Sequence, residues 1–349
     1  MTNPRPLPQR RRTLRTAADL VQAGLVEAPR LEALQAVAER YAVAITPALT
    51  DLMDATDPAD PIARQFLPDE RELVTSPEEL ADPIGDEVWS PVKGIVHRYP
   101  DRVLLTPILH CPVYCRFCFR REKVGGEEAV LAEADLTAAL DYIRAHDEVW
   151  EVILTGGDPL MLPAAKLKSL IGAIEDIPHV QVIRIHSRVP VGDPERVGPT
   201  LLDALTTSKA LWLAVHCNHP KELSPAAEAA LSRLSGAGIP LLGQSVLLKG
   251  VNDDPETLAE LMKALVRNRV KPYYLHHPDL APGTGHFRLS IQEGQALVAG
   301  LRGRISGLCQ PTYVLDIPGG HGKSPLAKGY VEGVTVTDWQ GRPHTYPPQ

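Results

Sequence analysis

Apolar and polar positions follow two different rhythms after about residue 100 of the chain. Short runs that are apolar almost throughout are separated by longer stretches in which apolar residues recur every three or four positions. The first pattern is typical of buried parallel strands, and the second of amphipathic helices. The expected strands are RVLLTPIL (102–109), VWEVILTGG (149–157), HVQVIRIHSR (179–188), ALWLAVHCN (210–218), IPLLGQSVLL (239–248) and VKPYYLHH (270–277). The expected helices include LTAALDYIRAH, AAKLKSLIGAIEDI, PAAEAALSRLSGAG and PETLAELMKALVRN.

Six such strand–helix units predict an α/β fold in which parallel strands form a barrel or part of one. In barrels of this kind the chemistry gathers at the C-terminal ends of the strands. The preceding region is rich in proline and otherwise helical in pattern, for example in RLEALQAVAERYAV. We therefore expect a helical extension over residues 1–95, the barrel over 96–325 and a short tail over 326–349.

Composition narrows the classes of function. Hydrophobic residues make up 44% of the 349 residues, which is enough for a substantial core, and the net charge is −7 with a pI of about 6.0. This charge gives no reason to expect a nucleic acid or a membrane surface as partner. No run approaches ~18 apolar residues, and the N-terminus lacks the apolar segment of a secretory signal. Five cysteines, an odd number and mostly clustered, favour a reducing cytoplasm over a disulfide framework.

Three cysteines stand close together in HCPVYCRFCFRREKV, at Cys111, Cys115 and Cys118. A structural zinc usually takes four ligands, often in two separated pairs. A lone triplet of cysteines is therefore a weaker indication of a zinc site than of an iron–sulfur cluster. A [4Fe–4S] cluster held by only three cysteines leaves one iron open to a small molecule. The C-x3-C-x2-C spacing is typical of radical S-adenosylmethionine enzymes, in which that iron binds S-adenosylmethionine.

The ordered motifs along the chain extend this likeness. The chain resembles the lysine 2,3-aminomutase family, whose members are radical S-adenosylmethionine enzymes that also carry pyridoxal phosphate. The resemblance runs from about residue 60 to about residue 335 and implies a partial, three-quarter (β/α)6 radical S-adenosylmethionine barrel that also holds the pyridoxal phosphate. The motifs that carry it are HRYPDRVLL, CPVYCRFCFRR, LTGGDPL, RIHSRVPV, HCNHPKE, GQSVLLKGVND, KPYYLHHPDL, GHFR and DIPGGHGK.

By this resemblance, several strand ends would contact S-adenosylmethionine. Gly156, Gly157 and Asp158 follow an expected strand, where the glycines allow close approach of the backbone and the acid can accept from an ammonium group. An ordinary Gly-Asp turn would look the same in isolation. His216 and Gln244 end later strands, at positions where the family contacts the same cofactor, although a lone residue of either kind is more often structural.

The segment GGHGKSP raises a choice between two phosphate sites. A P-loop would need a glycine at position 317, which is Ile317, so that pattern fails. The resemblance makes Lys323 the lysine that bonds covalently to pyridoxal phosphate. It also places Arg98 and Tyr99 beside that cofactor, with Arg98 paired to its phosphate.

The resemblance further implies how an amino acid is held. Arg120 would bind the α-carboxylate in a bidentate pair. Asp279 and Asp316 match the two aspartates with which lysine-acting members bind the distal ammonium, and two carboxylates would repel the γ-carboxylate of glutamate. The alternative without a binding role is that both aspartates lie in ordinary turns or loops.

The expected activity is that of an isomerase, a lysine 2,3-aminomutase that interconverts L-lysine and β-lysine by a 5′-deoxyadenosyl radical mechanism. Two alternatives stay open: a branch that supplies β-lysine for modification of elongation factor P, and a related 2,3-aminomutase such as one for glutamate. The expected cofactors are the [4Fe–4S] cluster, S-adenosylmethionine and pyridoxal phosphate. The expected partners are L-lysine, a flavodoxin or ferredoxin as reductant, and further copies of the chain in a homo-oligomer.

Overall fold

The computed structural model describes residues 12–126, 130–327 and 329–347. In this part of the chain, nine strands form one sheet whose spatial order follows the sequence. Strands β2 to β8 run parallel, and β1 and β9 flank them as antiparallel edges. The strands are β1 (Ile95–Tyr99), β2 (Arg102–Ile108), β3 (Glu151–Gly156), β4 (Val182–Ser187), β5 (Ala210–His216), β6 (Leu241–Val246), β7 (Val270–His276), β8 (Thr312–Ile317) and β9 (Gly322–Pro325).

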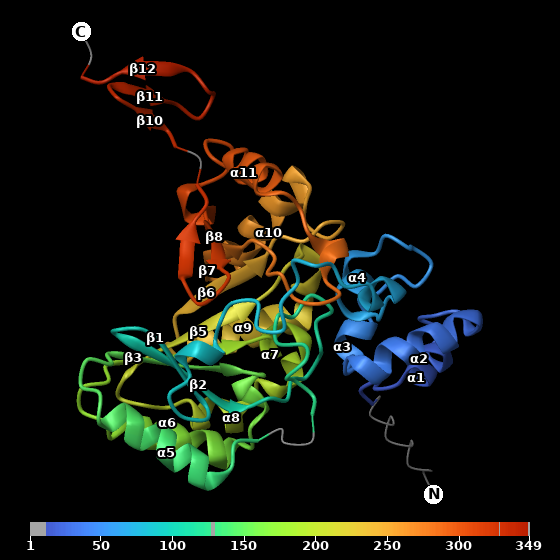
Figure 1. The fold of residues 1–349 in the computed structure, drawn as a ribbon, viewed down its shortest axis with the longest axis vertical. Helices are drawn as coiled ribbons and strands as arrows, with labels where there is room; N and C mark the ends of the chain where they lie inside the picture. Colours follow the sequence, from blue (N-terminus) through green and yellow to red (C-terminus); the bar gives the residue numbers. More distant parts are fainter. Residues whose placement is uncertain (1–11, 127–129, 328, 348–349) are drawn as a thin grey trace, which may run out of the picture.

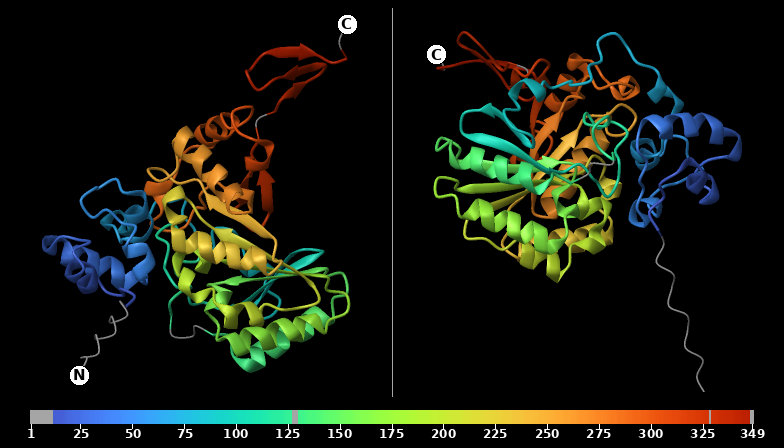
Figure 2. Two further views of the ribbon diagram at one scale, coloured as in Figure 1. Left: turned by 180° about the vertical axis from the view of Figure 1, so that it is seen from behind. Right: turned by 60° about the horizontal axis from the view of Figure 1, so that its bottom comes forward.

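A helix follows each parallel strand from β2 to β7, so the six predicted strand–helix units are present and the predicted partial barrel is confirmed. The helices lie on the outside of the curved sheet (Figures 1 and 2). They are α5 (Glu133–Arg144), α6 (Ala164–Glu175), α7 (Val189–Gly192), α8 (Pro199–Ala204), α9 (Pro225–Gly236), α10 (Pro255–Arg267) and α11 (Ile291–Ala299). The described strands β1 and β9 do not pair with each other, so the barrel stays open between its two antiparallel edges.

Burial and capping explain why these segments take these forms. Apolar side chains of the parallel strands, such as Leu154, Ile183 and Leu213, are fully or almost fully buried in one core shared with the outer helices. Helix α10 begins where the Asp254 side chain accepts hydrogen bonds from two backbone N–H groups and Pro255 occupies the first turn. Both features favour a helix start at that point of the sequence.

The region before the barrel contains the helices α1 (Ala17–Gln22), α2 (Leu31–Arg40), α3 (Pro47–Thr50) and α4 (Pro61–Phe66), which gather at one side of the barrel in Figure 1. They share a second core with Val113 of the cysteine loop. This core therefore fixes the cysteine loop against the barrel. From residue 67 to the start of β1 the chain has only short 3-10 turns, so the helical character expected for the whole extension ends earlier than the sequence pattern indicated.

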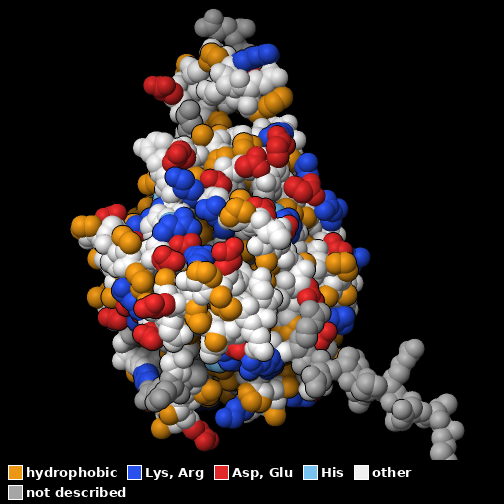
Figure 3. Space-filling view, turned by 90° about the vertical axis from the view of Figure 1, so that its right-hand side faces the viewer, with side chains coloured by type: hydrophobic (Ala, Val, Ile, Leu, Met, Phe, Trp, Pro, Cys, Tyr) orange, Lys and Arg blue, Asp and Glu red, His pale blue; other side chains and the backbone are white. Residues whose placement is uncertain are grey.

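The last residues form a small antiparallel sheet of β10 (Val331–Glu332), β11 (Thr335–Thr337) and β12 (Pro343–Thr345), which projects from the body in Figures 1 and 2. The expected division at residues 95 and 325 stays a prediction. Acidic and basic side chains intermingle over the face drawn in Figure 3. In the part of the chain that the structure describes, no helix is long and apolar enough to cross a membrane.

Candidate active site

The cysteine loop connects β2 with α5 and holds three free thiols close together. Burial raises the pKa of Cys115 to about 11, and burial also raises the pKa of Cys118. The pKa of Cys111 is raised well above its usual range, first by burial and then by the charges of Asp158 and of the other two thiols. The guanidinium groups of Arg120 and Arg188 lower the pKa of neighbouring thiols and so favour thiolates there.

These properties fit an iron–sulfur cluster better than a single ion. Among the described residues, no three His, Cys, Asp or Glu side chains converge closely enough to hold one metal ion. A [4Fe–4S] cluster binds each thiolate to a different iron, so its ligands surround the cluster without converging on one point. The Nη1 atom of Arg188 lies 3.4 Å from Cys115 Sγ, which places a donor beside a thiolate that the cluster would carry.

The glycine pair after β3 is required by close packing against the cysteine loop. Gly156 has a φ of +106°, and a Cβ atom there would overlap the Thr106 side chain. A Cβ atom on Gly157 would lie 2.6 Å from both the backbone nitrogen and the carbonyl oxygen of His110. The backbone N–H of Gly157 also donates to the carbonyl of Ile108 at 2.7 Å. The glycines thus bring this loop directly against the residues that precede Cys111.

Asp158 is buried and joins the loops after β3 and β4. Its carboxylate accepts hydrogen bonds from the Ser187 hydroxyl at 2.9 Å and from the backbone N–H groups of Arg188 and Leu160 at 2.7 and 3.1 Å. Burial raises the pKa of Asp158 to about 6, although these hydrogen bonds oppose the shift. The expected contact of Asp158 with S-adenosylmethionine stays a prediction, and its present partners assign it a role in holding two loops together.

Polar atoms without partners mark the interior of the barrel at the strand ends. His216 and Gln244 are neighbours across β5 and β6, and the Nε2 atom of the first and the Oε1 atom of the second are buried without a hydrogen bond to any described residue. Burial lowers the pKa of His216 to about 3, so its ring is neutral. The Nε2 atoms of His186 and His276, at the ends of β4 and β7, are also unpartnered. Buried polar groups are rarely left unpaired, so the arrangement of this cluster fits the binding of a polar ligand.

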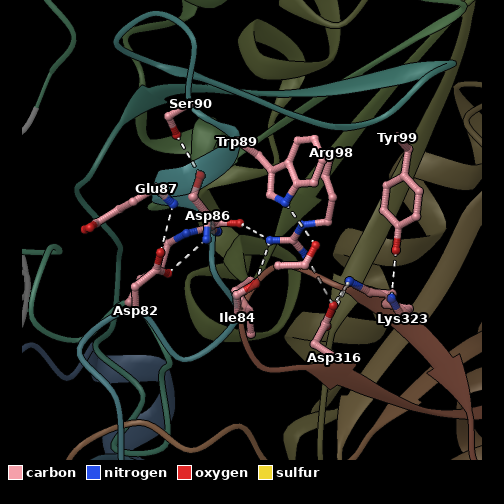
Figure 4. Close-up of polar contacts among 12 residues, drawn as sticks. Asp82, Ile84, Asp86, Glu87, Trp89, Ser90, Arg98, Tyr99, Asp316 and Lys323 are labelled. Atoms are coloured by element: carbon pink, nitrogen blue, oxygen red, sulfur yellow. Dashed lines mark hydrogen bonds and ion pairs between the residues drawn. The ribbon is translucent and has the colours of Figure 1, made fainter.

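Lys323 reaches the same region from the edge strand β9. Antiparallel pairing places it opposite Asp316 of β8, and its Nζ atom lies 2.9 Å from the Asp316 carboxylate. The hydroxyl of Tyr99 accepts a hydrogen bond from the Lys323 backbone N–H at 2.8 Å (Figure 4). A Cβ atom on Gly322 would lie 2.6 Å from that hydroxyl, so the glycine permits the contact.

Asp316 and Asp279 form the acidic end of the site. Burial would raise the pKa of Asp316, but His276 and Lys323 outweigh burial and keep it well below its usual range. Asp279 has the opposite behaviour: burial raises its pKa to about 7, and the charge of Asp316 contributes to the rise. The Oδ1 atom of Asp279 is buried and has no hydrogen-bond partner in the part of the chain that the structure describes. The structure thus brings the two sequence-predicted aspartates close enough to repel each other.

Arg98 and Arg120 share one acidic partner that the sequence analysis did not identify. The Oδ1 atom of Asp86 lies 2.9 Å from Arg98 Nη2, and its Oδ2 atom lies 2.7 Å from Arg120 Nη2. Arg98 also lies 3.7 Å from Asp316, so it stands near the acidic end of the site. Its expected pairing with a cofactor phosphate stays a prediction.

A cavity beside Lys323 has the composition that pyridoxal phosphate requires. Arg102, Arg184, Tyr273 and Tyr274 line it together with Lys323, and none of the first four was a sequence-predicted site residue. The cavity therefore offers a primary amine, aromatic rings and guanidinium donors suited to an aromatic aldehyde with a phosphate group. Arg102 begins β2, and Arg184, Tyr273 and Tyr274 lie inside β4 and β7, where no motif marked them as site residues.

Comparisons with known proteins agree with this arrangement. The model of the Radical SAM superfamily matches residues 105–262. The L-lysine 2,3-aminomutase of Clostridium subterminale is 41% identical over 309 residues, covering 87% of this chain and 74% of that protein. The L-lysine 2,3-aminomutase of Acetoanaerobium sticklandii is 43% identical over 289 residues, covering 83% and 70%. The glutamate 2,3-aminomutase of Clostridioides difficile is 34% identical over 316 residues, covering 89% and 75%.

The family model covers the cysteine loop, His216 and Gln244, and the similarities to the aminomutases extend over most of the chain. They confirm the resemblance inferred from the motifs, and with it an isomerase whose cofactors are a [4Fe–4S] cluster, S-adenosylmethionine and pyridoxal phosphate. The chain belongs to the lysine 2,3-aminomutase family of radical S-adenosylmethionine enzymes.

Proposed function

We propose that the protein acts on L-lysine and moves its amino group from C2 to C3 to give β-lysine. The observation that carries this proposal is the pair of carboxylates, Asp279 and Asp316, beside Lys323. Burial raises the pKa of Asp279, and the charge of Asp316 adds to the rise, so a substrate with a cationic end would stabilise both carboxylates. A substrate with a second carboxylate would increase the electrostatic repulsion at this end of the site.

The strength of this discrimination follows from burial. Two like charges about 4 Å apart repel by roughly 4 kcal/mol at an effective dielectric constant of about 20. The side chain of Asp316 is only 4% exposed, so solvent screens it little. Glutamate is therefore disfavoured unless a proton or a cation accompanies it, whereas lysine brings its own cation.

Lys323 itself illustrates the recognition that we propose. Its side chain is a lysyl ammonium, and Asp316 accepts it at 2.9 Å from both carboxylate oxygens. Lys323 would hold pyridoxal phosphate, which would supply the covalent carrier of the amino group. The Asp316 carboxylate would accept the distal ammonium of a substrate in the same way as it now accepts Lys323, with Asp279 as second acceptor.

The other residues have roles that follow from their chemistry. We assign the cluster to Cys111, Cys115 and Cys118, and the α-carboxylate of the substrate to Arg120. When bound, the cluster and S-adenosylmethionine supply one-electron chemistry, and pyridoxal phosphate supplies a covalent carrier for the amino group. The protein holds the amino acid at both charged ends, which fixes the position of C3 between them.

The reductant and the surroundings are part of the same proposal. A one-electron carrier of the flavodoxin or ferredoxin class would reduce the cluster, and thiolate ligands of this kind suit a reducing compartment, the cytoplasm. The five cysteines, all in the described residues, are free. Assembly into a homo-oligomer stays a prediction.

The test is a direct comparison of substrates. Protein reconstituted anaerobically with iron, sulfide and pyridoxal phosphate is supplied with S-adenosylmethionine and a reductant, and then with L-lysine or L-glutamate. We expect β-lysine as the faster product, and a loss of about tenfold or more in kcat/KM for lysine in Asp279→Asn and Asp316→Asn. Faster turnover of glutamate, or unchanged lysine turnover in both variants, would contradict the proposal.

A further inference from the structure

The segment from Asp82 to Ser90, which we call the clasp, lies over the Lys323 side of the site (Figure 4). The Asp82 carboxylate accepts the backbone N–H groups of Asp86 and Glu87 at 3.0 and 2.8 Å, which fixes the turn that presents Asp86. The Ser90 hydroxyl donates to the Asp86 carbonyl at 2.9 Å. The clasp therefore has a defined shape of its own.

Two further contacts fasten the clasp to the loop that leads to Lys323. The Trp89 Nε1–H donates to the carbonyl of Gly320 at 2.9 Å. Gly85 adopts a φ of +66°, and a Cβ atom there would overlap the backbone of Gly319 and Gly320. The position of Asp86 is thus set from both sides, by its own turn and by the loop before Lys323.

Each carboxylate oxygen of Asp86 contacts a different arginine. Its contacts are 2.9 Å to Arg98 Nη2 and 2.7 Å to Arg120 Nη2. The three side chains are 8–12% exposed, so these charges are poorly solvated. Without the Asp86 carboxylate, the buried Arg120 guanidinium would lose its charged partner, and Arg98 would be left with the longer 3.7 Å contact to Asp316.

The second contact of Arg120 completes its orientation. Its Nη1 atom lies 3.4 Å from the Thr155 hydroxyl, whereas the contact with Asp86 uses the other terminal nitrogen, Nη2. A guanidinium has five N–H groups, so these two contacts leave donors for an incoming carboxylate. The carboxylate of Asp86 cannot itself bind a substrate carboxylate, because the two would repel each other.

We propose that Asp86 is a positioning residue of the amino-acid site, which acts through Arg120 to fix the guanidinium that receives the substrate α-carboxylate. This inference rests on the proposed function, which assigns the α-carboxylate to Arg120. It adds a residue from outside the barrel to the determinants of substrate recognition. It also explains why the clasp is fastened to the loop of Lys323, since the two ends of the site then keep a fixed spacing.

The experiment compares two ligands that differ only at the carboxylate. L-lysine and cadaverine, which is lysine without its carboxylate, are titrated by calorimetry into pyridoxal phosphate-loaded protein without reductant. Wild type should bind lysine more tightly than cadaverine, and Arg120→Ala should abolish the difference. Asp86→Asn should reduce the lysine-to-cadaverine preference by about tenfold or more while cadaverine binding is kept, because a charged hydrogen-bonding partner is lost.

The neighbouring Glu87 supplies a matched control. Its side chain is 67% exposed and pairs with Lys123, so Glu87→Gln removes the same charge one residue along the clasp and should leave the preference unchanged. Asp86→Glu, which keeps the charge, should recover part of the preference. The inference would be overturned if Asp86→Asn kept the preference for lysine over cadaverine, or if it weakened the binding of both ligands equally. A wild-type protein without any preference would instead refute the assignment of Arg120 and the proposed function.

Discussion

Lysine should bind more weakly as the pH falls through about 7, because its distal ammonium requires Asp279 in the ionised form. Burial raises the pKa of Asp279 to about 7. The negative charges of Asp316 and Asp86 add to this rise, and the positive charges of Lys323 and Arg120 oppose it. A bound ammonium favours the charged carboxylate and lowers that pKa. Above pH 7 the free protein is already ionised at Asp279, and below pH 7 a proton must leave before the ammonium can pair.

The size of the effect follows from the fraction of Asp279 that is ionised. With a pKa of about 7 in the free protein, this fraction falls roughly tenfold between about pH 8 and about pH 6. If the bound ammonium keeps the carboxylate ionised over this range, the dissociation constant of lysine rises by the same factor. A tenfold change corresponds to about 1.4 kcal/mol of binding free energy.

The assay must separate Asp279 from the α-amino group of the ligand, which also titrates. Norleucine is lysine without its distal amino group, so the ratio of the two dissociation constants isolates the distal end. Calorimetric titrations of pyridoxal phosphate-loaded protein should give a preference for lysine that falls about tenfold from pH 8 to pH 6. The preference should become independent of pH in Asp279→Asn. A flat ratio in wild type, or the same slope in the variant, would refute the reasoning.

Two further predictions concern the cofactor ligands. Cys115→Ala should lower the iron bound after anaerobic reconstitution and abolish formation of 5′-deoxyadenosine, and a variant that still forms it would exclude Cys115 as a ligand. Borohydride treatment of pyridoxal phosphate-loaded protein, followed by peptide mapping, should place the label on Lys323. A label on another lysine would overturn that assignment.

The barrel was predictable because its parallel strands are covered on both faces. Such strands must be apolar along most of their length, so they are visible as continuous runs in the sequence, and the intervening helices have a single apolar face. The pattern failed at the edges. Strand β9 (Gly322–Pro325) has the sequence GKSP, which has no strand periodicity, and it forms because the chain turns back on β8.

The residues of the site likewise fall into those that the sequence predicted and those that it did not. The cysteine triplet could be assigned from its spacing, whereas Lys323 was assigned from the resemblance of its motif to the family. Asp86 lies in a polar, proline-rich segment, and its two arginine partners are 12 and 34 residues further along the chain. Only the path of the clasp over the barrel brings them together. The cavity residues Arg102 and Arg184 were missed for a related reason: the first begins β2 and the second lies inside β4, and the sequence does not show which strand side chains line a common cavity.

Substrate choice depends on such local contacts more than on overall similarity. The L-lysine 2,3-aminomutase of Bacillus subtilis is 36% identical to this chain, and the glutamate 2,3-aminomutase of Clostridioides difficile is 34% identical. Identities this close cannot separate a cationic from an anionic substrate end. Asp279 and Asp316 can, because each is an acid in a poorly solvated site, where burial first and the charge of Asp316 second raise the pKa of Asp279. A cation relieves the repulsion between the two carboxylates and an anion increases it, so the charge of the substrate follows from these two residues.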